Sequence, residues 1–232
     1  HRDLHRLIRR QRQMCIRDRS IGCNKAAKGL WFKLEKDKNN PSYWKLLAHL
    51  YLQQNNYKKG VTAFTIYSYL NPLKREEMVL LGDLNQAIGL PLKAAEYYEK
   101  VVGIGGDKIS DYEKLASTYL AGHRPERAKV ALERALNKGP NSRLWFMMGQ
   151  VLYEEEKFEE AYCAFKKSAV LNDEDGGCYL MMGYCALQTG KKSEAGIAFK
   201  KAAQFPRQRK MARKLLKQVV LWKKNERGDG KN

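Results

Sequence analysis

A pattern of large and small residues recurs along this chain about every 34 residues. In each copy a large apolar or aromatic residue stands four positions before a small one, and a second small residue follows twelve positions later. The copies begin at residues 44, 78, 112, 145 and 179, so the steps between them are 34, 34, 33 and 34 residues. A period of about 20 to 50 residues held over several copies is typical of a repeat protein, in which each unit packs on its neighbours.

Each copy contains two apolar stripes with the spacing of an α-helix. In the first copy the two stripes are Trp44, Leu47, Ala48 and Tyr51, and then Gly60, Ala63, Phe64 and Tyr67. Short polar turns separate them, and a small residue stands in each stripe where two helices would cross closely. The small positions of the first stripe are Ala48, Gly82, Ala116, Gly149 and Gly183. The sequence therefore predicts an all-α protein built from helix pairs.

This pattern resembles the tetratricopeptide repeat over residues 24–206. The resemblance implies a right-handed α-solenoid of helix-turn-helix repeats with a C-terminal capping helix. The second copy departs from the pattern, because Asn85 replaces an aromatic residue and Gly103, Gly105 and Gly106 replace the usual proline. We expect a looser junction after this copy.

We predict five full repeats over residues 40–206, preceded by a partial repeat over 20–39 in which Ala26 and Leu30 belong to a second helix. A capping helix is predicted over 207–225, with Met211, Leu215, Val219 and Trp222 on one stripe, and a polar tail over 226–232. Residues 1–19 are set apart, because Gln13–Arg19 resembles the translation of a sequencing adapter. They are expected to be non-native or a disordered basic arm, so that the repeats begin in mid-unit.

The net charge of +19 raises the question of a nucleic-acid partner. Its distribution argues against one, because residues 21–205 hold 27 Lys and Arg against 21 Asp and Glu. Residues 206–232 hold ten basic residues against two acidic ones. A basic closing helix of this kind suits anionic lipid, an acidic partner or RNA.

No motif for catalysis is visible in the sequence. No histidine stands at metal-ligand spacing from Cys, Asp or Glu, and no catalytic triad pattern occurs. We therefore predict no enzyme activity, no metal, no cofactor and no small-molecule substrate. Five cysteines without a C-x-x-C pair are expected to be buried free thiols, Cys163 among them.

The resemblance implies a concave groove that binds a protein or peptide, lined mainly by the first helix of each repeat. Carried onto this chain, the family's contact positions predict the partner-binding residues Lys45, His49, Asp83, Gln86, Phe146, Gln150, Tyr153, Leu180 and Tyr184. Further contact positions fall on Glu113, Ser117, Leu120 and Arg143. The carboxylate clamp of chaperone-tail binders is broken, because His49 and Leu80 stand where asparagines should be.

A narrower resemblance concerns the segments Leu34–Trp44 and Gly89–Ala95 and the basic closing helix. They are similar to bacterial tetratricopeptide proteins found alongside the TonB–ExbB–ExbD system, which implies a periplasmic accessory of TonB-dependent transport. The alternatives are a generic cytoplasmic adaptor and a basic solenoid that binds RNA or anionic lipid.

Overall fold

The structure is a computed structural model that describes residues 22, 25–105 and 108–228. Within these residues the regular elements are α-helices and none is a strand, which confirms the predicted all-α class. The chain forms two compact units, of which the first ends at Ile104 and the second begins at Gly105. This division falls in the glycine segment that the sequence singles out.

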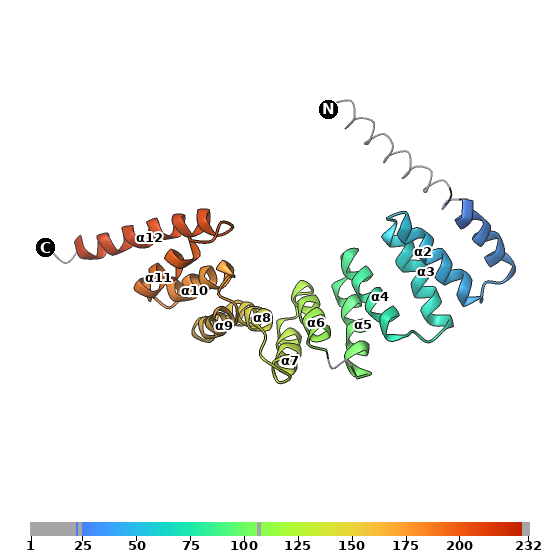
Figure 1. Cartoon of the computed structure of the whole chain (residues 1–232), viewed down its shortest axis with the longest axis horizontal. Helices are drawn as coiled ribbons and strands as arrows, with labels where there is room; N and C mark the ends of the chain where they lie inside the picture. Colours follow the sequence, from blue (N-terminus) through green and yellow to red (C-terminus); the bar gives the residue numbers. More distant parts are fainter. Residues whose placement is uncertain (1–21, 23–24, 106–107, 229–232) are drawn as a thin grey trace, which may run out of the picture. The chain divides into compact units, whose positions relative to one another are not determined.

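The first unit consists of helix hairpins. Residues 25–36 are helical and are followed by α2 (Pro41–Gln53), α3 (Tyr57–Leu70), α4 (Arg75–Ala87) and α5 (Pro91–Gly103). Each hairpin packs its two helices on each other, α2 on α3 and α4 on α5, and α3 also packs on α4 (Figure 1). Local signals start the helices: Asn40 accepts a hydrogen bond from the Ser42 N–H and Pro41 takes the first helical position.

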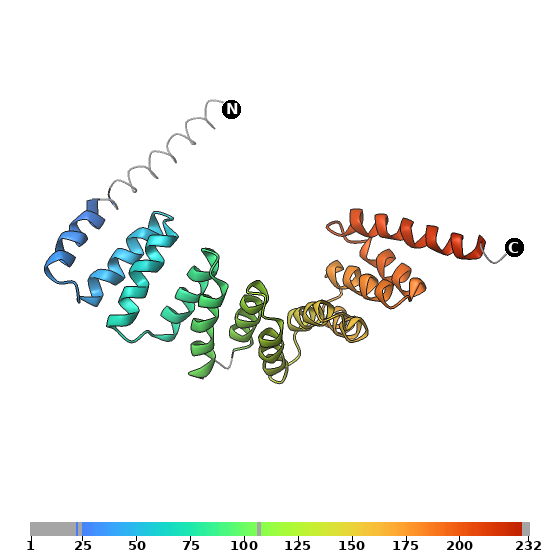
Figure 2. The ribbon, with the colours of Figure 1, turned by 180° about the vertical axis from the view of Figure 1, so that it is seen from behind.

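The second unit continues the same plan (Figures 1 and 2). Its helices are α6 (Ile109–Ala121), α7 (Pro125–Leu136), α8 (Ser142–Glu154), α9 (Phe158–Leu171), α10 (Gly176–Gln188), α11 (Lys192–Ala202) and α12 (Arg209–Gly228). The hairpins pair α6 with α7, α8 with α9 and α10 with α11, and α12 packs on α11. No helix in the described part of the chain has the length and apolar character needed to cross a membrane.

Every hairpin turn contains one residue with a left-handed backbone, again at the repeat spacing. These residues are Asn55, Gly89, His123, Glu156 and Gly190, with φ between 53° and 81°. The next N–H in each turn bonds back into the preceding helix, as Asn56 does to the Tyr51 carbonyl at 2.9 Å. This is the hydrogen bond of a Schellman motif, which ends a helix tightly. The same turn thus reverses the chain in each repeat.

In three hairpins a small residue of the first helix packs against a large residue of the second helix. A Cβ atom added to Gly82, Gly149 or Gly183 would lie 2.7, 2.7 and 2.3 Å from a ring atom of Tyr98, Phe165 and Phe199 respectively. Contacts under 3.0 Å do not occur for real Cβ atoms, so the ring occupies the space that a larger residue would need. The structure thereby gives the reason for the small residues at this position.

A buried carboxylate joins two hairpins of the first unit. Glu77 of α4 accepts hydrogen bonds from the Lys45 ammonium at 2.7 Å, the Tyr67 hydroxyl at 3.1 Å and the Lys74 N–H at 2.9 Å. Burial by itself would raise the pKa of Glu77, but these three donors outweigh it and hold the pKa below its usual value. The network fixes α4 against α2 and α3.

Some residue expectations differ from the structure. Leu30 is buried, but Ala26 is exposed and Ala27 is buried beside it. The residue that matches Ala26 in the first complete hairpin is Gly60, which packs on Leu52 of the first helix. The segment predicted to supply the corresponding helix for Ala26 lies outside the described residues.

The predicted stripe of α12 is also partly wrong. Val219 is buried and Leu215 half-buried, but Met211 is exposed and Ala212 is buried instead. Residues four apart drift by about 40° around a helix of 3.6 residues per turn, so Met211, two such steps before Val219, lies about 80° away from it and leaves the contact. The predicted stripe also includes Trp222, whose side chain lies outside the described part.

The cysteines among the described residues differ in their burial. Cys178 and Cys185 are buried free thiols, as predicted, and burial raises their pKa values to about 11 and about 12. Cys163 is exposed, so the prediction of a buried thiol is wrong there. It lies on the outer side of α9, away from the buried face formed by Ala161, Ala164 and Phe165.

Replacing Gly183 by alanine tests the small-on-aromatic contact. Glycine to alanine inside a helix ordinarily stabilises a protein by up to about 1 kcal/mol. Here we expect a destabilisation of about 1–3 kcal/mol, because the new methyl group would overlap the buried Phe199 ring. The matched control is Gly196→Ala in α11, where the nearest atom to the new Cβ is 3.9 Å away and the ordinary stabilisation should appear. Urea unfolding followed by circular dichroism measures both, and equal shifts in the same direction would contradict the contact.

Replacing Glu77 by glutamine tests the buried network through pH. Because the pKa of Glu77 is lowered by folding, its ionised form stabilises the protein above the unfolded pKa of about 4.3, and this contribution is lost as the pH falls through the folded pKa. Glu77→Gln should therefore cost about 1–3 kcal/mol at pH 7 and less at pH 3. The control is Glu96→Gln, which removes an exposed pair with Lys93 inside one helix and should change little. A pH-independent loss for Glu77→Gln would show that its charge does not matter.

Candidate functional site

The predicted contact positions lie beside the hairpin cores rather than free of them. The His49 ring is 6.1 Å from Phe64, and the Tyr184 ring is 5.7 Å from Phe199. These residues follow the small position of their helix by one, so they rest on the same large residue of the second helix. One side of the His49 ring and one side of the Tyr184 ring are therefore held by the fold.

In the first unit the predicted residues are mostly engaged with their own fold. Lys45 binds Glu77, and the Asp83 carboxylate accepts a hydrogen bond from the Tyr98 hydroxyl at 2.6 Å. Burial and the bond to Asp83 raise the pKa of Tyr98, so its hydroxyl stays protonated and keeps donating. Gln86 and His49 are exposed.

The second unit has a surface hollow of about 580 Å³, and the predicted contact residues Phe146 and Gln150 are among those that line it. It is lined by Ser117, Leu120, Ser142, Arg143, Phe146, Met147, Gln150, Asn172 and Asp175. These residues come from α6, from α8 and from the segment between α9 and α10. The hollow therefore spans the first helices of two successive repeats and reaches the start of a third.

Part of the wall of the hollow is apolar and is formed by Leu120, Phe146 and Met147. Leu120 and Phe146 are half-buried, and Met147 is buried. The Phe146 ring packs at 5.4 Å and a steep angle on Phe165, the residue that fills the hairpin core. Such edge-to-face contacts hold an aromatic side chain in one orientation. Phe146 thus presents a fixed apolar face to the hollow.

The polar groups around the hollow differ in how far they are already satisfied. Arg143 forms an ion pair with Glu113, and Asp175 accepts from the Gly177 N–H at 2.9 Å as the cap of α10. Ser117 donates to the Lys114 carbonyl at 2.9 Å. The side-chain amide of Gln150 has no hydrogen-bond partner among the described residues. It can therefore donate to and accept from a ligand.

The other predicted residues of this unit lie outside the hollow. Tyr153 packs on Phe158 with ring centroids 5.2 Å apart, and Leu180 and Tyr184 pack against the last core cluster with Ala195 and Phe199. The structure brings Phe146 and Gln150 together and leaves these three apart from them. Sequence reasoning missed Ser142, Met147, Asn172 and Asp175. The family positions come from the first helices alone, whereas Asn172 and Asp175 follow a second helix, where only their helix-end residue types mark them.

The described residues contain no group of three or more His, Cys, Asp or Glu side chains placed to hold a metal ion. The hollow itself offers apolar side chains, an amide and an ion pair. This set suits recognition of a chain segment by contact and hydrogen bonding.

Comparison with known proteins supports the fold. The model of the family described as anaphase-promoting complex, cyclosome, subunit 3 matches residues 121–202, just over a third of the chain. A human protein, Protein O-mannosyl-transferase TMTC1, is 21% identical over 170 residues, which are 71% of this chain. The chain spans only 19% of the length of that curated relative.

Solved structures with the same arrangement include MamA, with 21% identity, a TM-score of 0.63 and coverage of 71% of this chain and 90% of that one. YrrB, a TPR protein with an unusual peptide-binding site, has 16% identity, a TM-score of 0.63 and coverage of 82% and 99%. The APC/C hetero-tetramer Cut9–Hcn1 has 16% identity, a TM-score of 0.56 and coverage of 85% and 39%. At this level of identity the likeness shows the fold alone: the chain has the all-α solenoid fold of the tetratricopeptide-repeat proteins.

Proposed function

We propose that this protein is a non-catalytic scaffold that holds an extended segment of another protein in the hollow of the second unit. The observation that carries the proposal is the combination of a fixed apolar wall at Phe146 with an uncommitted amide at Gln150. The two residues are four positions apart on α8 and so lie on one face of that helix.

Each part of the hollow has a counterpart in an extended peptide. An apolar peptide side chain can pack between Leu120, Phe146 and Met147, where it leaves water. The Gln150 amide can donate to a peptide carbonyl and accept from a peptide N–H, as one backbone does to another. Because Phe146 is held in place by Phe165, binding costs little side-chain ordering.

The named relatives favour a protein partner in general. The YrrB structure is described with a peptide-binding site, and Cut9–Hcn1 is itself an assembly of protein subunits. We carry over only the class of ligand, a protein segment. The described part of this chain adds a hollow of suitable size on one face of successive repeats.

The narrower form of the proposal is an accessory of TonB-dependent transport in the periplasm. It rests on the resemblance of Leu34–Trp44, Gly89–Ala95 and the basic closing helix to proteins found alongside TonB, ExbB and ExbD. The alternative is a cytoplasmic adaptor with the same hollow. Cross-linking of the tagged chain in its source cells distinguishes the two: recovery of TonB, ExbB or ExbD supports the accessory role, and recovery of cytoplasmic proteins alone contradicts it.

Two substitutions test the hollow with peptides selected from a random displayed library on the whole chain. Phe146→Ala should weaken binding of the selected peptides at least about tenfold, as truncation of a central aromatic contact does. Gln150→Ala should weaken it several-fold without touching the Phe146–Phe165 contact. Fluorescence anisotropy of labelled peptides gives the dissociation constants.

The control is Ile197→Ala, which removes an apolar side chain that is 71% exposed on α11, outside the hollow. It should leave the affinity unchanged. Unfolding midpoints of all three variants separate loss of the site from loss of the fold. Wild-type affinity in both Phe146→Ala and Gln150→Ala would place the peptides elsewhere and overturn the proposal.

A further inference from the structure

The outward face of α12 carries a concentrated positive charge. Arg209, Lys210, Arg213, Lys214 and Lys217 are all exposed and stand within the first nine residues of the helix. The sequence contains no Asp or Glu from Pro206 to Asn225. None of these five cations forms an ion pair within the described residues. Elsewhere basic residues meet carboxylates of a neighbouring repeat, as Lys191 meets Glu159 at 2.8 Å.

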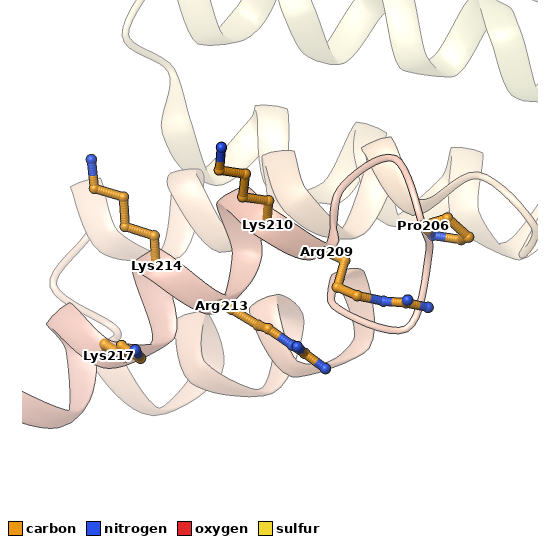
Figure 3. A pocket seen from close by; sticks show the side chains of 6 residues that line it. All are labelled: Pro206, Arg209, Lys210, Arg213, Lys214 and Lys217. Carbon is orange, nitrogen blue, oxygen red and sulfur yellow. The ribbon is translucent and has the colours of Figure 1, made fainter.

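This charge lies on the side of α12 that points away from the fold. The opposite side packs on α11, with Ala212 and Val219 buried and Leu215 and Leu216 half-buried against the last core cluster. The five basic side chains and Pro206 line an open hollow of about 460 Å³. Figure 3 shows Lys210 and Lys214 extending in parallel from the helix and Arg209 and Arg213 extending together along another direction.

The same face continues into apolar residues. Val220 and Leu221 are 51% and 58% exposed. Val220 follows Arg213 by seven residues and Leu221 follows Lys214 by seven, which is about two turns of helix and returns to the same side. The outward face is therefore basic over its first turns and apolar at 220–221. Exposed apolar side chains beside lysine and arginine are typical of helices that lie on a membrane surface.

We propose that this face of α12 docks the protein on the surface of an anionic lipid bilayer. The five cations would meet phosphate and carboxylate head groups, while Val220 and Leu221 enter the boundary between head groups and acyl chains. The carbon stems of lysine and arginine can lie along that boundary while their charged ends stay in the head-group layer.

Other anionic partners fit the face less well. A single-stranded nucleic acid is held by aromatic stacking as well as charge, and residues 206–221 contain no aromatic side chain. The hollow is lined by one helix and the proline before it, so it has no second wall to enclose a peptide. A bilayer needs neither, and it gives the apolar end of the face a place to be buried. The inference concerns a different surface from the peptide hollow and does not depend on it.

The test is co-sedimentation of the whole chain with vesicles of phosphatidylcholine alone and of phosphatidylcholine mixed with phosphatidylglycerol. Binding is expected only to the mixed vesicles. It should weaken as added salt shortens the Debye length from about 10 Å at 0.1 M to about 3 Å at 1 M. The triple variant Lys210→Glu, Lys214→Glu, Lys217→Glu should lose about a hundredfold in affinity or more.

A control variant changes the net charge of the protein by the same amount as the triple variant of α12. Lys28→Glu, Lys58→Glu and Lys166→Glu change the same number of exposed lysines on three other helices and should retain most of the binding. The pair Val220→Ser and Leu221→Ser should lower affinity at least about tenfold while the dependence on salt stays. Circular dichroism verifies that each variant is folded.

Three results would overturn the proposal. One is equal binding, or equal absence of binding, with neutral and anionic vesicles. Another is an equal loss in the two lysine triples, which would show that net charge and not this face is responsible. The third is tighter binding to oligouridylate or polyglutamate than to anionic vesicles at the same salt concentration, which would assign the face to RNA or to an acidic protein segment.

Discussion

The contact of a small residue in one helix with a large side chain in the partner helix is the interaction on which the hairpins depend, and it is seen directly in four of them. Gly183 allows the Phe199 ring to reach the backbone of α10, and Gly82 and Gly149 do the same for Tyr98 and Phe165. The large side chain is fully buried in each case. Since the helices of a hairpin can approach only as closely as this pair permits, the repeat can tolerate variation elsewhere while this position stays small.

The same contact shapes the candidate binding surface. The large residue of the second helix packs on nearby residues of the first helix as well as on the small position. His49 and Tyr184 follow that position by one residue and Phe146 precedes it by three, and each lies against a core ring. A binding surface built in this way is rigid because it is the rim of the core. In the second unit the rim opens into a hollow at Phe146. In the first unit Lys45 instead binds Glu77 of the next repeat, and Asp83 accepts a hydrogen bond from Tyr98 of its own hairpin.

The repeats and the closing helix α12 differ in whether their basic residues are paired with acidic ones. Basic residues meet acids of a neighbouring repeat, as in the pairs of Lys45 with Glu77 and Lys191 with Glu159. The first turns of α12 have no such acids near them in the sequence, and their cations remain on the surface. The outward face of α12 is basic over its first turns and apolar at Val220 and Leu221, a combination that suits the surface of an anionic bilayer.

The sequence by itself determined the all-α hairpin architecture, because the helical spacing of apolar residues is a local property and is present in every copy of the 34-residue repeat. It also determined which positions had to be small. Only the tertiary structure decided which of the predicted contact residues share a site. Tyr153 and Phe146 are both predicted contact residues. Tyr153 packs on Phe158, whereas Phe146 lines a hollow with residues of α6 and of the segment before α10. The exposure of Met211 and the burial of Ala212 were likewise set by how α12 lies on α11. Such choices depend on side chains that are distant in the chain, and no local pattern records them.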